Sequence, residues 1–286
     1  MTDSWLHLSA RTGAASLDAL ANFVIERGAP GVVLKRRGLE AYFPHSTSDR
    51  VLKQSIRRFL GSLAAGNGTK ARLQWKIIGE ENWHDSWRRF IKPRRVGKSF
   101  WVTPPWLKPP KFRRRQVIVI EPGLAFGTGT HATTRGCMEF LEQVAEGLHG
   151  QRFTALDVGT GAGILAIAAV KSGAKQVWAI DCDAVALEVA KKNFIANGVA
   201  GRIRLSGVKL TDVKASFAVV AANLTAETII ELAAPLAKKV SSRGFLILSG
   251  ILRQKTAAVL DRFRGKFHVI RQKRGPEWST LLLRRK

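Results

Sequence analysis

The chain has 286 residues, 45% of them hydrophobic, and 47 lysines and arginines against 21 aspartates and glutamates give it a formal net charge of +26. This length and apolar content suit a globular protein with a full core and about two domains. No run of about 18 apolar residues is free of charged residues or glycine breaks, and the first residues lack a signal-peptide pattern, so we expect a soluble, cytoplasmic protein with no membrane segment.

The cysteines and the charge limit the classes of partner. Cys137 and Cys182 are the only cysteines and have no histidine at metal-ligand spacing, so we expect no metal site, no disulfide, and two small buried side chains. The excess positive charge has two explanations that stay open. It is either a solvated basic surface or a face for contact with ribosomal RNA.

Residues 1–80 predict a small ferredoxin-like α+β domain. Strands are expected at 5–10, 32–35, 39–43 and 72–78, with one helix that Ser16 caps and a second helix at 49–63. The resulting order β-α-β-β-α-β is that of the ferredoxin-like fold. Because nothing in this domain is typical of catalysis, we interpret it as a substrate-recognition domain.

Residues 81–115 predict a stiff connector, rich in Trp, Pro and Arg and without a regular pattern. Basic residues between Trp83, Trp87, Trp101 and Trp106 are typical of a clamp for single-stranded RNA. Tryptophans beside prolines are equally typical of a packed joint between domains, and both interpretations stay open.

Residues 116–286 predict a doubly wound α/β domain whose sheet has seven strands, with one helix at 225–240 and an antiparallel hairpin formed by the last two strands. Before the first helix of this domain, residues 122–134 are rich in Gly and Thr. We expect this segment to form a loop with hydroxyl donors that covers a small ligand.

The central motif is a glycine turn between a buried strand and a helix. Gly159, Gly161 and Gly163 follow Asp157 in the pattern D-x-G-x-G-x-G. A dinucleotide-binding turn would need a third glycine at position 164, where this chain has Ile. The pattern is similar to the S-adenosylmethionine turn of doubly wound methyltransferases, although a purely structural turn uses the same residues.

Polar side chains follow two further strands of the predicted sheet. Asp181 lies 24 residues beyond Asp157, near the spacing at which an acid accepts hydrogen bonds from ribose hydroxyls. Asn223 ends an apolar strand, where it either contacts a ligand or only caps the helix that follows. Because ligands bind at the carboxyl ends of parallel strands, we expect Gly159, Asp181 and Asn223 to converge.

Six segments give the chain a resemblance to a known family: 87–93, 121–134, 156–168, 222–224, 248–252 and 277–278. With them the chain resembles the bacterial methyltransferases of ribosomal protein L-eleven (L11) over nearly its whole length. The resemblance implies that Thr134, Gly159, Asp181 and Asn223 contact S-adenosylmethionine. It also implies that the first domain holds the ribosomal protein, whose ε- and α-amino groups are methylated.

The sequence therefore predicts an S-adenosylmethionine-dependent protein N-methyltransferase acting on lysine side chains, the N-terminus or both in L11, and working as a monomer. The predicted cofactor-binding residues are Thr134, Gly159, Gly161, Gly163, Asp181 and Asn223. Asn223 is also the predicted catalytic residue, which accepts a hydrogen bond from the attacking amine or holds the methionine group. Two alternatives stay open: an RNA methyltransferase of the same fold, and a non-enzymatic binding module.

Overall fold

A computed structural model gives the fold for residues 4–35, 38–46, 48–67, 72–79, 92–107, 115–121, 131–148 and 150–286. These residues divide into two compact units, one up to Lys92 and the other from Pro93 onward. None of the helices in these ranges has the length and apolar character needed to cross a membrane.

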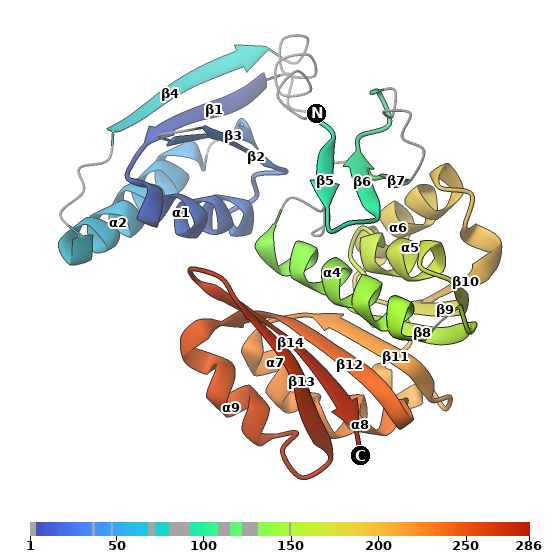
Figure 1. Cartoon of the computed structure of the whole chain (residues 1–286). Coiled ribbons are helices and arrows are strands. Elements are labelled where there is room, and N and C mark those ends of the chain that lie inside the picture. Colours follow the sequence, from blue (N-terminus) through green and yellow to red (C-terminus); the bar gives the residue numbers. More distant parts are fainter. Residues whose placement is uncertain are drawn as a thin grey trace. The chain divides into compact units, whose positions relative to one another are not determined.

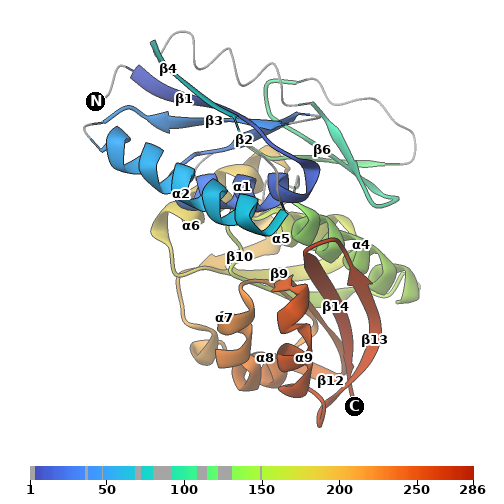
Figure 2. The same ribbon diagram turned by 90° about the vertical axis from the view of Figure 1, so that its left-hand side faces the viewer.

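The first unit is a four-stranded sheet with two helices against it (Figures 1 and 2). The strands lie in the order β2-β3-β1-β4, and every neighbouring pair is antiparallel. Its core consists of inward-facing residues of β1 and β3 packed on one face of each helix, among them Leu6, Leu20 and Ile56. The elements are β1 (Ser4–Arg11), α1 (Ala14–Glu26), β2 (Val32–Lys35), β3 (Gly38–Pro44), α2 (Asp49–Asn67) and β4 (Arg72–Gly79).

The second unit contains the predicted seven-stranded sheet, in the order β10-β9-β8-β11-β12-β14-β13. The first five strands are parallel, and β14 runs antiparallel to both β12 and β13, which confirms the predicted terminal hairpin. The strands are β8 (Phe153–Val158), β9 (Ala174–Ile180), β10 (Ile203–Ser206), β11 (Phe217–Asn223), β12 (Val240–Leu252), β13 (Phe267–Arg274) and β14 (Trp278–Arg285).

Helices cover both faces of this sheet, as Figure 1 shows. Successive residues of β11 point to opposite faces, so Val219 enters the core under one helical layer and Val220 the core under the other. This alternation explains why the strand is apolar without a break. The helices of one layer are α4 (Ala132–Gly147), α5 (Ile164–Lys171) and α6 (Ala184–Ala196); those of the other are α7 (Ala226–Glu231), α8 (Ala233–Lys239) and α9 (Thr256–Asp261).

A small three-stranded sheet, β5-β6-β7, corrects the prediction of an irregular connector. It consists of β5 (Arg94–Val96), β6 (Phe100–Thr103) and β7 (Gln116–Val119). Strands this short show almost no alternation of apolar and polar residues. The turn between the first two depends on a side chain that is distant in the sequence. Glu142 of α4 accepts bonds from the backbone N–H groups of Lys98 and Ser99 at 2.9 and 2.8 Å. Trp83 and Trp87 of the predicted clamp lie outside the described residues.

Three local predictions were wrong. Helix α1 starts before Ser16, because Gly13 in an extended conformation takes the cap position. The predicted helix at 225–240 is two helices, since Pro235 has no N–H to donate to the carbonyl four residues earlier. Cys182 is exposed because it lies in the turn after β9, whereas Cys137 is buried in α4.

Candidate active site

The carboxyl ends of three neighbouring strands meet at one edge of the seven-stranded sheet. Val158 of β8 is the register partner of Ile180 in β9 and of Ala222 in β11, so the residues that follow them lie side by side. With strands about 4.8 Å apart, this row spans about 10 Å. The strand order reverses between β8 and β11, which is where open α/β sheets bind ligands. The residues in the row are the predicted Gly159, Asp181 and Asn223.

The glycine turn has a backbone that only glycine adopts without strain. Gly159, Gly161 and Gly163 have φ angles of 69°, 52° and 84°. A Cβ at Gly159 would lie 2.4 Å from Cδ2 of Leu224, and one at Gly163 would lie 2.4 Å from Cε1 of Phe194. The backbone conformation therefore favours glycine at both positions, and at Gly163 the buried ring of Phe194 also leaves no room for a side chain.

The side chain of Asp157 holds the glycine turn through hydrogen bonds. Its place in the D-x-G-x-G-x-G pattern does not by itself reveal this role. The side chain is 2% exposed, and its Oδ2 accepts bonds from Oγ1 of Thr160 at 2.7 Å and from the N–H of Ala166 at 3.1 Å. Burial raises the pKa of Asp157 to about 7, although these two hydrogen bonds oppose the rise. Its other oxygen, Oδ1, is buried and has no hydrogen-bond partner among the residues that the structure describes.

Asp181 joins the turn to the neighbouring strand end. Its Oδ2 accepts a bond from the N–H of Gly161 at 2.8 Å, and its Oδ1 accepts one from the N–H of Asp183 at 3.1 Å. A carboxylate oxygen has two acceptor positions. This partly exposed side chain can therefore hold the turn and still accept a hydrogen bond from a ligand hydroxyl.

Asn223 meets Thr134, which lies 89 positions away in the sequence. Nδ2 of Asn223 donates to Oγ1 of Thr134 at 3.3 Å, and Thr134 is fully buried in the first turn of α4. The cap of α7 is Thr225, so the interpretation of Asn223 as a helix cap was wrong. Oδ1 of Asn223 is also buried, and none of the described residues donates a hydrogen bond to it.

Two side-chain oxygens on adjacent strands, Oδ1 of Asp157 and Oδ1 of Asn223, are thus buried and without a hydrogen-bond donor among the described residues. A buried acceptor without a donor costs about 1–3 kcal/mol, so such a pair is suited to a ligand that carries N–H or O–H groups. All six predicted cofactor-binding residues belong to this edge, its turn or the start of α4. Residues 122–130 of the predicted covering loop lie outside the described residues.

Comparison with known proteins identifies relatives over the whole chain. The family model described as ribosomal protein L11 methyltransferase matches residues 4–286. The ribosomal protein L11 methyltransferase of Geobacter sulfurreducens is 37% identical over 99% of both chains, and that of Geobacter metallireducens is 36% identical over 99% of this chain and 98% of its own.

A solved structure agrees with these relatives. The crystal structure of ribosomal protein L11 methylase from Lactobacillus delbrueckii subsp. bulgaricus superposes with a TM-score of 0.62 at 32% sequence identity. It covers 68% of this chain and 100% of its own.

Proposed function

Since this chain belongs to the ribosomal protein L11 methyltransferase family, we propose that it transfers methyl groups from S-adenosylmethionine to amino groups of L11. Lysine side chains, the N-terminal amine or both are the acceptors in this proposal. Family membership carries the reaction, and the arrangement of the six site residues supports the identity of the methyl donor.

The two buried acceptor oxygens are the observation that carries the cofactor assignment. S-adenosylmethionine supplies an electrophilic methyl group on a sulfonium, and its ammonium and ribose hydroxyls are hydrogen-bond donors. Asp181 accepts from the ribose hydroxyls, as its place at the end of the second strand favours. Oδ1 of Asn223, or Oδ1 of Asp157 once that carboxyl is ionised, accepts from the ammonium, which relieves the cost of leaving a buried oxygen unpaired.

The residues of the site assist the reaction by position. An amine attacks a methyl group only as the neutral base, and burial favours that form because it disfavours the ammonium. Oδ1 of Asn223 accepts a hydrogen bond from an N–H of the amine and so directs the nitrogen lone pair toward the methyl group. Thr134 holds the Asn223 amide in place through its own hydrogen bond. Holding both reactants at near-attack distance contributes roughly 7–11 kcal/mol to such a displacement.

Residues 1–80, which belong to the first unit, form the proposed substrate-recognition domain with a ferredoxin-like fold. Its element order and its antiparallel strand order β2-β3-β1-β4 support the fold. In the same proposal residues 81–115 connect it to a methyltransferase domain at 116–286.

The deciding experiment incubates the full-length protein with methyl-labelled S-adenosylmethionine, unmethylated L11 and ribosomal RNA together. We expect label in L11 alone, and peptide mass spectrometry then assigns it to lysine or N-terminal amines. Label in the RNA alone would instead establish the RNA methyltransferase alternative. A protein that binds no S-adenosylmethionine by calorimetry would be the non-enzymatic binding module.

A further inference from the structure

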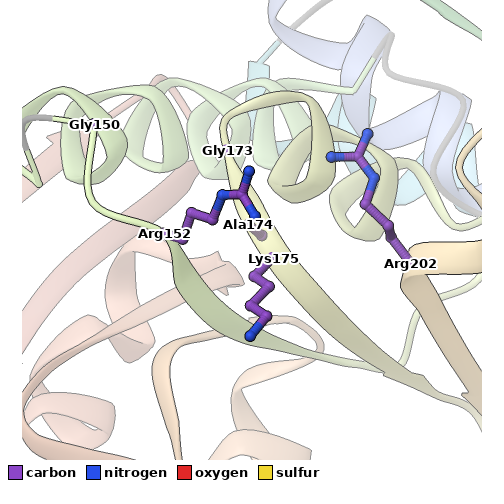
Figure 3. A pocket seen from close by; sticks show the side chains of 6 residues that line it. All are labelled: Gly150, Arg152, Gly173, Ala174, Lys175 and Arg202. Atoms are coloured by element: carbon purple, nitrogen blue, oxygen red, sulfur yellow. The ribbon is translucent and has the colours of Figure 1, made fainter.

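A basic pocket lies at the edge of the seven-stranded sheet opposite the candidate active site. It has a volume of about 340 Å³ and forms where β8 and β9 begin, beside the short turn that leads into β10. Because β8 has six residues, about 20 Å separates this edge from the row of strand ends described above. Its lining residues, all labelled in Figure 3, are Gly150, Arg152, Gly173, Ala174, Lys175 and Arg202.

The charge of this pocket has one sign. Arg152, Lys175 and Arg202 are exposed, and no acidic residue is among the lining residues. In the part of the chain that the structure describes, none of these three cations belongs to an ion pair. Like charges grouped without counter-charges repel one another, so an anion that enters the pocket is attracted by all three.

A fourth cation is affected by the same positive field. Lys171, at the end of α5, has a pKa lowered by partial burial and by the charge of Arg202. Burial is the larger cause of this lowered pKa, and the charge of Arg202 adds to it. A bound anion near Arg202 would oppose that effect.

Open space borders the pocket at its two glycines. Gly150 and Gly173 have φ angles of 79° and 106°, and a Cβ at either would meet no atom within 4 Å, so the chain leaves open space there. Figure 3 shows Arg152 reaching toward Gly173, whereas Lys175 and Arg202 point in different directions. Side chains that diverge in this way suit separate charged groups along a chain better than one compact ion.

We propose that this pocket binds successive phosphate groups of a single-stranded RNA. A phosphodiester backbone carries a charge on every unit, and arginine matches phosphate geometry with paired N–H donors. The chain's net charge of +26 attracts such a polyanion from a distance. This binding is separate from methyl transfer, since the pocket lies at the other edge of the sheet.

The test measures binding of a short mixed-sequence RNA to the full-length protein over a series of salt concentrations. Each phosphate contact contributes about 0.7 to the slope of log affinity against log salt, so R152A/K175A/R202A should lower the slope by about 2. The control K191A/K214A/R262A removes the same charge from exposed positions outside the pocket and should retain most of the slope. Methylation of L11 should be unchanged in the pocket variant.

Competition experiments identify which class of anion the pocket binds. Inorganic phosphate and polyglutamate, each matched to chloride in ionic strength, should displace no more RNA than chloride does. Displacement by inorganic phosphate at low concentration would assign the pocket to a small anion, and equal competition by polyglutamate would assign it to acidic protein segments. Either result would overturn the RNA proposal, as would equal RNA binding by the pocket and control variants.

Discussion

The backbone N–H of Gly161 donates a hydrogen bond of 2.8 Å to Oδ2 of Asp181, so the end of β9 supports the turn that follows β8. The carboxylate predicted to bind a ligand is thus also part of the scaffold of the glycine turn. Removing it should alter the turn and the ligand contact together.

Asp181→Ala should weaken binding of S-adenosylmethionine roughly 10- to 100-fold, because a hydrogen bond to a charged group contributes about 1.5–3 kcal/mol. Isothermal titration calorimetry measures the change. The matched control is Asp183→Ala, which removes the side-chain cap of α6 and should cost about 1 kcal/mol of stability without loss of cofactor affinity. Unchanged affinity in Asp181→Ala would remove its role toward the ribose.

Asn223→Ala should lower kcat for L11 methylation at least about tenfold, or about 1.4 kcal/mol of transition-state stabilisation. Thr134→Val keeps the side-chain volume but removes the bond to Nδ2 of Asn223, so it should cause a smaller loss in the same direction. Steady-state kinetics and calorimetry on the same samples separate two roles. A lower kcat with unchanged cofactor affinity identifies the acceptor of the amine, and weaker affinity with unchanged kcat identifies a ligand of the methionine group. No change in either quantity would contradict both.

Asp157 should make the protein less stable as the pH rises toward neutral. In the unfolded chain this carboxyl ionises at about pH 3.9, but in the folded protein it holds its proton up to about pH 7. The folded state therefore binds more protons between these values, and the free energy of unfolding falls as the pH rises through this window.

Asp157→Asn carries no charge and can still accept the bonds from Thr160 and Ala166, so it should lose this part of the pH dependence. Urea unfolding at pH 5 and pH 8 measures the pH dependence of the free energy of unfolding. Asp212→Asn neutralises an exposed carboxylate and should behave as the unmodified protein does. Equal pH dependence in Asp157→Asn and the unmodified protein would refute the assignment.

Gly163→Ala should destabilise the protein by about 1–3 kcal/mol, because its φ of 84° disfavours a side chain and the new Cβ would collide with the buried ring of Phe194. Gly147→Ala is the control: it lies at the end of α4, and a Cβ there meets no atom within 4 Å. Thermal unfolding compares the two variants. Equal midpoints would show that the turn tolerates a side chain.

Local pattern predicted the strands and the polar residues at their ends because both depend on short stretches of chain. The apolar run of β11 and its terminal Asn223 can be read directly, and parallel strands bring their ends to one edge. The same local reading failed for β5 and β6, whose turn depends on Glu142, more than forty positions away.

The sequence by itself determined the seven-stranded sheet, the glycine turn and the polar residues Asp181 and Asn223 at the strand ends, since periodicity and residue spacing encode them. Only the tertiary structure decided that Asn223 meets Thr134 and that Arg152, Lys175 and Arg202 line one pocket. It also decided that Asp157 and Asn223 each keep a buried oxygen with no donor in the described part of the chain. Burial and like-charge clustering arise from segments that meet after folding, so no spacing in the linear chain records them.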